Sequence, residues 1–99
     1  ACRTSGGTGH TVDDDTVFEF QRRLAEEEGI FAEPAAAVAL AGAAQATAAD
    51  ELDLDTNIVC LVTGSGFKDA SSIDRMNTNR DAPLVESFEE FETIVRATI

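Results

Sequence analysis

The sequence has no tryptophan and no tyrosine, and its only aromatic residues are six phenylalanines among 99 residues. Hydrophobic residues still make up 43% of the chain, which excludes wholesale disorder and leaves Ala, Val, Leu and Ile to fill most of the interior. No apolar run approaches the roughly 20 residues that a membrane-spanning helix needs. The first ten residues contain no apolar stretch of the kind found in a secretory signal, so we expect a cytoplasmic protein.

Positive charge is also scarce. Six arginines and one lysine stand against 19 acidic residues, for a formal net charge of −12. Duplex nucleic acid and anionic membranes are therefore disfavoured as partners, because both are bound through clustered cations. Acid-rich, lysine-poor surfaces are typical of halophilic proteins, whose self-repulsion is screened by salt. Our hypothesis is a protein from a salt-accumulating cell, with an ordinary acidic protein as the alternative.

Cysteine and histidine are too few and too dispersed for a metal centre. Cys2, Cys60 and His10 have no partners at ligand spacing, so we predict neither a disulfide nor a metal site. Cys60 lies within an apolar run and is interpreted as a small buried hydrophobic residue. His10 is interpreted as incidental.

Two helices are predicted in the first half of the chain, after a short strand at 9–12. Residues 13–15 offer N-cap candidates for a helix that runs to Glu28, with Gly29 as the residue that ends it. The core-facing side of this helix is formed by Val17, Phe20, Gln21 and Leu24. Pro34 begins a second, alanine-rich helix, whose almost wholly apolar composition predicts burial on most sides.

The second half predicts a sheet. Residues 58–62, IVCLV, form an uninterrupted apolar run typical of a central strand buried on both faces. The loop at 63–69 follows its C-terminal end, where open α/β sheets bind ligands. Residues 70–83 are polar and predicted as a loop, and a capping box begins a last helix at 87–98. This order predicts an α/β fold: a partial three-layer open sheet of mostly parallel strands with helices on both faces.

Three stretches of the chain resemble one enzyme family. EGIF at 28–31, EPA at 33–35 and TGSGFKD at 63–69 are similar, in order and spacing, to the C-terminal part of fold-type II pyridoxal-phosphate enzymes. Within this tryptophan synthase beta-like superfamily, the stretches look most like those of threonine synthases. The resemblance implies that residues 1–99 form a single segment, the C-terminal part of the domain that binds pyridoxal 5′-phosphate.

The same resemblance implies roles for four residues beside the cofactor. The hydroxyl of Thr63 would face the pyridine nitrogen, where a neutral group makes a milder electron sink than a carboxylate. Gly64 would let the backbone approach the ring, and Ser65 would border the substrate. Glu33 would be a second polar group near the ring edge. The alternative for Glu33 is a carboxylate that binds backbone N–H groups at the start of a helix.

Lys68 is the only lysine, and TGSGFKD also resembles PTGSFKDR, the string that carries the Schiff-base lysine of threonine synthases. The extra residue Gly66, the replacement of Arg by Ala70 and the preceding EPA helix favour the C-terminal assignment instead. Lys68 is then a loop charge beside Asp69. On this interpretation the chain has neither a Schiff-base lysine nor a phosphate-binding loop, so we assign no catalytic residue to it.

The function implied is a portion of a threonine synthase, a lyase of threonine biosynthesis that converts O-phospho-L-homoserine and water to L-threonine and phosphate. Ser65 and Ala70 stand where threonine synthases commonly have His and Pro, so a serine/threonine dehydratase is an alternative. A non-catalytic acidic interaction or assembly domain is a second alternative. The expected partners are the remainder of the enzyme or a second subunit, a small amino-acid substrate and, when complete, further copies in a homo-oligomer.

Overall fold

The computed structural model describes residues 1–78 and 83–99, which form helices and connecting segments. Within these ranges the only paired extended backbone is an isolated antiparallel bridge between Ala32 and Ser65. The predicted α/β fold with an open, mostly parallel sheet is therefore wrong for this chain. In chain order the elements are α1 (Cys2–Ser5), α2 (Asp14–Glu28), α3 (Pro34–Ala48), the 3-10 turn η1 (Gly66–Lys68), α4 (Ala70–Asn77) and α5 (Phe88–Thr98).

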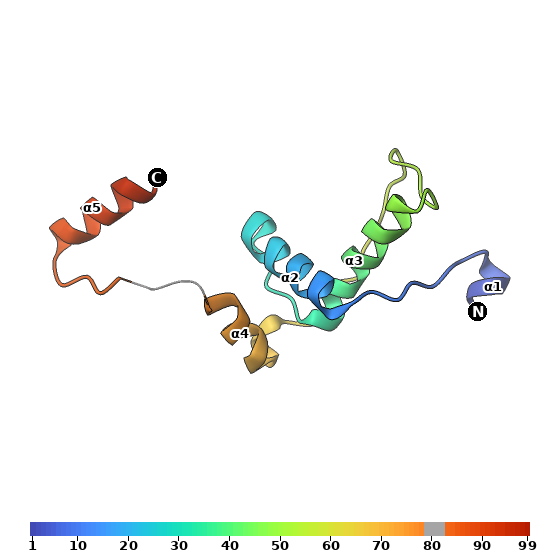
Figure 1. The fold of residues 1–99 in the computed structure, drawn as a ribbon, viewed down its shortest axis with the longest axis horizontal. Coiled ribbons are helices and arrows are strands. Elements are labelled where there is room, and N and C mark those ends of the chain that lie inside the picture. Colours follow the sequence, from blue (N-terminus) through green and yellow to red (C-terminus); the bar gives the residue numbers. More distant parts are fainter. Residues whose placement is uncertain (79–82) are drawn as a thin grey trace.

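Residues 58–62 show why the predicted sheet is absent. The segment runs back beside α3 without pairing to another strand in the described part of the chain (Figure 1). Val59 and Leu61, on one face, are 87% and 76% exposed, and Ile58 and Val62, on the other face, are 46% and 40% exposed, so neither face is buried. A strand needs a neighbour that takes up its backbone N–H and C=O groups, and an apolar sequence alone does not supply one. Cys60 is only half-buried, with its Sγ 3.7 Å from the carbonyl oxygen of Ala39.

Helix α2 begins and ends where its sequence predicts. The carboxylate of Asp13 accepts a hydrogen bond from the backbone N–H of Thr16 at 2.9 Å, which is an N-cap. The hydrogen bonds from Thr16 also hold the pKa of Asp13 below its ordinary value. At the other end, Gly29 has φ 70°, in the left-handed region that favours glycine.

The core of the chain is the contact between α2 and α3. Val17 and Leu24 of α2 are the buried large apolar side chains in this contact, each contributing about 1.5–3 kcal/mol when fully buried, and Phe20 packs beside them partly buried. They meet small side chains on α3 and just before it: Ala36, Ala37, Ala41 and Ala32. Small residues allow the two helices to pack closely. Val38, on another side of α3, is 41% exposed, so residues 1–78 and 83–99 do not bury that side, and the predicted burial on most sides would need a further partner.

The N-terminal segment is held by side chains rather than by strand pairing, so the predicted strand at 9–12 is also wrong. The His10 Nε2 atom lies 2.9 Å from Glu51 Oε2, and Gln45 Nε2 lies 3.4 Å from His10 Nδ1. A neutral ring with its proton on Nε2 satisfies both contacts, donating to the carboxylate and accepting from the amide. His10 thus joins the segment before α2 to the end of α3.

The C-terminal third contains one unpredicted helix and one predicted helix. Helix α4 occupies residues that we predicted as loop, and positions 79–82 of that prediction lie outside the described residues. Helix α5 begins at the predicted Ser87 cap, whose Oγ accepts from the N–H of Glu90 at 3.2 Å. The carboxylate of Glu90 accepts from the N–H of Glu86, one residue before the partner that a capping box predicts.

The chain is elongated. Its principal extents are 63 × 30 × 19 Å, with α1 and α5 toward opposite ends of the long axis (Figure 1). The radius of gyration is 18.1 Å. A compact domain of about 100 residues has a radius of gyration of about 13 Å, so much apolar surface stays open to solvent. None of the described helices is both long enough and apolar enough to cross a membrane.

Candidate functional site

Two segments far apart in the sequence meet at the bridge between Ala32 and Ser65. The N–H of Glu33 donates to the carbonyl oxygen of Gly64 at 3.0 Å, and the N–H of Gly66 donates to that of Phe31 at 2.9 Å. These two hydrogen bonds hold the 63–66 turn against the residues that precede α3. The structure therefore brings Glu33 close to the segment that contains Thr63, Gly64 and Ser65.

Gly64 is where this contact is closest. A Cβ atom added to Gly64 would overlap the carboxylate of Glu33. Glycine at this position leaves the space that the Glu33 side chain occupies, so the carboxylate lies directly against the backbone of the turn. Glu33 is also the residue before the first turn of α3, but its side chain makes no hydrogen bond that caps the helix. The capping alternative for Glu33 is therefore not what this structure contains.

Gly66 is required for space on the other side of the bridge. A Cβ atom at Gly66 would lie 2.6–2.7 Å from three ring carbons of Phe31, well inside ordinary contact. The Phe31 ring in turn packs edge-on against Phe67, with ring centroids 4.9 Å apart and planes at 87°. Such edge-to-face pairs are a favoured aromatic geometry. Gly66 is buried and its φ is not in the left-handed region, so close packing rather than backbone conformation favours glycine here.

Thr63 and Ser65 differ in what their hydroxyls do. Thr63 is exposed, and its hydroxyl has no hydrogen-bond partner among residues 1–78 and 83–99. The Ser65 Oγ accepts from the N–H of Phe67 at 3.3 Å and so caps η1. Lys68 is exposed in the same turn. Of the predicted residues, Thr63 thus offers a free hydroxyl, whereas Ser65 already serves the local fold.

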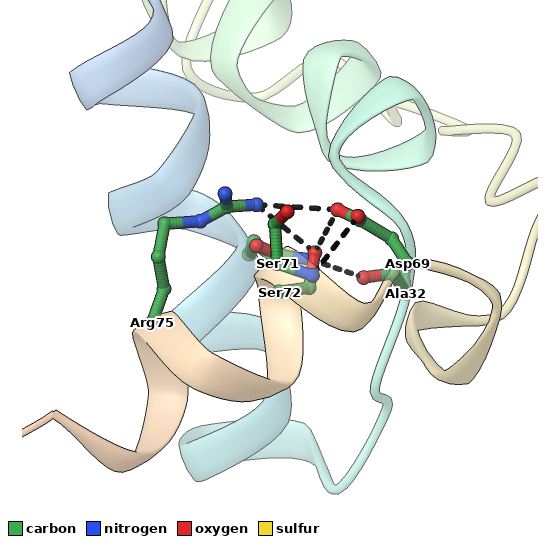
Figure 2. A network of polar contacts seen from close by, with 6 residues as sticks. Ala32, Asp69, Ser71, Ser72 and Arg75 are labelled. Carbon is green, nitrogen blue, oxygen red and sulfur yellow. Dashed lines mark hydrogen bonds and ion pairs between the residues drawn. The ribbon is translucent and has the colours of Figure 1, made fainter.

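A polar network centred on the buried residues Gln21 and Ser72 lies next to this turn, and no pattern in the sequence predicted it (Figure 2). Gln21 of α2 donates from Nε2 to the carbonyl oxygen of Ala32 at 2.7 Å and to Ser72 Oγ of α4 at 2.8 Å. The Ser72 hydroxyl donates to Asp69 Oδ2 at 2.6 Å. This hydrogen bond is the main reason that the pKa of the Asp69 carboxyl is lowered, with smaller effects from the backbone of Ser71.

Arg75 closes the network from α4. Its Nη2 donates to Ser72 Oγ at 3.0 Å and lies 3.3 Å from Asp69 Oδ2. Its guanidinium carbon lies 3.8 Å from the centre of the Phe18 ring on α2, a cation–π distance. The buried Nε atom has no hydrogen-bond partner in the part of the chain that the structure describes. Arg75 thus ties α4 to α2 as well as to Asp69.

An open groove lies beside the aromatic pair. Its volume is about 410 Å³, and its lining is mostly apolar. The side chains that line it are Ala25, Glu26, Phe31, Phe67, Ile73, Met76 and Asn77. None of the predicted site residues lines this groove. Within the described ranges no three metal-binding side chains gather either.

Comparison with known proteins decides the family. The family model described as "Pyridoxal-phosphate dependent enzyme" matches residues 1–64 of the chain. The chain belongs to this family of pyridoxal-phosphate dependent enzymes.

Its curated relatives are threonine synthases. The chain is 41% identical over 75 residues to the threonine synthase of Methanocaldococcus jannaschii, covering 76% of the chain and 18% of that protein. It is 42% identical over 69 residues to the threonine synthase of Synechocystis sp., and the match covers 70% of the chain and 18% of that protein. A threonine synthase of Bacillus sp. is 27% identical over 99 residues, which is the whole chain and 28% of that protein. The suspected relationship to threonine synthases is confirmed, and the chain spans about a fifth of the length of the first two relatives.

Proposed function

We propose that this chain is the C-terminal part of the cofactor-binding domain of a threonine synthase that uses pyridoxal 5′-phosphate. The reaction would convert O-phospho-L-homoserine and water to L-threonine and phosphate. The family match and the homology to threonine synthases support the proposal. The chain covers only part of those relatives, so the activity belongs to an enzyme of which this chain is one portion. The remainder of the enzyme or a second subunit is the expected partner.

The observation that carries the proposal is the meeting of Glu33 with the 63–66 turn. The Glu33–Gly64 backbone hydrogen bond of 3.0 Å places a carboxylate and the exposed Thr63 hydroxyl on segments that adjoin each other. The Glu33 carboxylate fills the space where a side chain at position 64 would lie, so it packs against the Gly64 backbone. An exposed hydroxyl beside this carboxylate and backbone offers polar groups to one edge of a flat heteroaromatic ring, which supports a fit to that part of the cofactor.

The cofactor, when bound, supplies the electron sink that stabilises carbanions during elimination and hydration. The role proposed for Thr63 is to present its hydroxyl to the pyridine nitrogen, which tunes the strength of that sink. Glu33 and Gly64 would define the ring edge, and Ser65 would lie on the substrate side. Lys68 has no part in this proposal: the Schiff-base lysine and the phosphate-binding loop would come from the remainder of the enzyme.

The experiment is the substitution Thr63→Val in the assembled enzyme with cofactor bound. Valine keeps the shape and removes the hydroxyl. One lost hydrogen bond of ordinary strength predicts a fall in kcat of about tenfold, together with a shifted cofactor absorption spectrum. Thr63→Ser, which keeps a hydroxyl, should retain most of the wild-type spectrum. Thr11→Val makes the same chemical change at an exposed residue before α2 and should alter neither quantity.

Three outcomes would contradict the proposal. A wild-type spectrum and rate in Thr63→Val would mean that the turn does not touch the ring. Release of a keto acid from the substrate instead of L-threonine and phosphate would identify the dehydratase chemistry that the sequence left open. Borohydride reduction that trapped the cofactor on Lys68 would overturn the assignment of this turn.

We also infer that the acidic surface suits a salt-rich cytoplasm. The net charge of −12 is spread over 99 residues. The described ion pairs of α2 and α5 are exposed pairs one helical turn apart: Arg22–Glu26, Arg23–Glu27 and Arg96–Glu92. Seven cations stand against 19 acidic residues, so the acidic side chains greatly outnumber the cations and salt would screen their repulsion.

A further inference from the structure

We propose that Gln21, Ser72 and Asp69 form a positioning network that holds the 63–66 turn in place. None of the three side chains belongs to the candidate ring site itself. They support the turn from outside the site, because Gln21 is hydrogen-bonded to Ala32 on one side of the turn and Asp69 to η1 on the other. The consequence for the cofactor rests on the proposed function of Thr63, whereas the positioning of the turn does not.

Gln21 fixes the side of the bridge that precedes α3. Its side chain is 1% exposed, and its two amide hydrogens are both used, on Ala32 and on Ser72. A carbonyl oxygen accepts only, so the contact with Ala32 also fixes which end of the amide points there. A buried amide is stable only when it is hydrogen-bonded, because burial removes its water. Since Ala32 is one of the two bridge residues, Gln21 connects α2 directly to the bridge.

Ser72 is the centre of the network, and its hydroxyl is saturated. It accepts from Gln21 and from Arg75, and it donates to Asp69. A hydroxyl offers one donor and two acceptor positions, so every position is filled. The side chain is fully buried, with no exposed fraction. Removing the hydroxyl would leave a buried amide hydrogen of Gln21 and a lone pair of Asp69 without their partner.

Asp69 fixes the other side of the turn. Its backbone N–H donates to the carbonyl oxygen of Gly66 at 3.1 Å, which ends η1. Its carboxylate accepts from the N–H of Ser71 at 3.2 Å and from the Ser72 hydroxyl, which begins α4. One residue therefore joins the end of the turn to the start of the helix.

The network thus reaches both sides of the bridge. Gln21 contacts Ala32 on one strand of it, and Asp69 contacts Gly66 on the other. Thr63 and Gly64 lie at the open end of the same turn. A hydroxyl stabilises charge on a ring only if it is already held in position, and neighbouring residues that do not contact the ring provide this support. Gln21, Ser72 and Asp69 supply that support here.

The test uses Gln21→Leu and Ser72→Ala in the assembled enzyme, measured by amide hydrogen exchange and by cofactor absorption. Leucine has a volume close to that of glutamine and lacks both donors. The amides of Glu33 and Gly66, which form the bridge, should exchange about tenfold faster in each variant. The amide of Ala41, in the α2–α3 core, should be unchanged and so report that the fold is intact. Ser71→Ala is the matched control, because this neighbouring serine is exposed and only its backbone N–H takes part in the network. Exchange at Glu33 and Gly66 should stay at the wild-type rate in this variant.

The spectrum separates this inference from the proposed function. A shift in Gln21→Leu and Ser72→Ala in the same direction as in Thr63→Val supports both. Unchanged exchange at Glu33 and Gly66 overturns the network, even if Thr63→Val alters the spectrum. Faster exchange at these amides with a wild-type spectrum in Thr63→Val supports the network and overturns the cofactor role. Equal acceleration at Ala41 would mean a general loss of stability and would also overturn the positioning role.

Discussion

Replacing Gly66 by alanine is the sharpest test of how the turn packs. The added Cβ would lie 2.6 Å from two ring carbons of Phe31 and 2.7 Å from a third. Ordinary carbon contacts begin near 3.5 Å, so three atoms overlap at once. The Phe31 ring also packs edge-on against Phe67, so moving it away from the added Cβ would disturb that pair. Overpacking of this kind costs about 1–3 kcal/mol.

The matched control is Gly42→Ala in α3. A Cβ atom at Gly42 would meet nothing within 4 Å, and glycine inside a helix is less favourable than alanine by about 1 kcal/mol. This variant should therefore be more stable than the wild type, while Gly66→Ala should be less stable. The two should differ by about 2–4 kcal/mol in the free energy of unfolding.

Urea unfolding followed by helical circular dichroism measures this difference. The unfolding midpoint should fall for Gly66→Ala and rise for Gly42→Ala, with the slope unchanged. Equal midpoints for the two variants would refute the reasoning, since they would show that the space beside Phe31 is not needed. Restoration of stability by Phe31→Leu in the Gly66→Ala background would confirm the ring as the obstacle.

Two further predictions concern charge. The pKa of Asp69 is lowered, chiefly by the Ser72 hydroxyl, so its stabilising effect is present above its ordinary value of 3.8 and is lost as the pH falls through its value in the folded chain. The free energy of unfolding, measured over a range of pH, should be larger for the wild type than for Asp69→Asn at pH 7. This difference in stability should disappear below about pH 4, and a difference that did not change with pH would contradict the prediction. The net charge of −12 predicts that multimolar potassium chloride raises the unfolding temperature, and a temperature that salt leaves unchanged would sink the halophilic interpretation.

Local signals in the sequence predicted the helices at 14–28 and 88–98 well. The Asp13 and Ser87 caps and the left-handed Gly29 depend only on residues within one turn of each helix end, so they can be recognised without tertiary context. The helix α4 was missed although its signals were present. Asp69 is its N-cap, and Ile73 and Met76 have the spacing of one helical face.

Long-range features followed the sequence less closely. The sheet was inferred from the apolar run at 58–62, but pairing depends on neighbouring strands that the run does not specify. The link from Gln21 to Ser72 spans 51 residues, and no local pattern reveals it. The sequence did place Gln21 on the buried face of its helix, and a polar side chain there was the available signal that a buried partner exists. The meeting of Glu33 with Gly64 was expected only through the family resemblance.

The open segment at 58–62 has a practical consequence for anyone who prepares this chain. Five consecutive apolar residues, without a charge or a proline, lie largely exposed, and their backbone groups make no hydrogen bond to the rest of the described chain. Such segments template intermolecular β-pairing and amyloid-like assembly. Expression of residues 1–99 without a partner should therefore favour inclusion bodies, despite the strong negative charge of the chain. A lysine at Val59 or Leu61 would act as a gatekeeper against that aggregation.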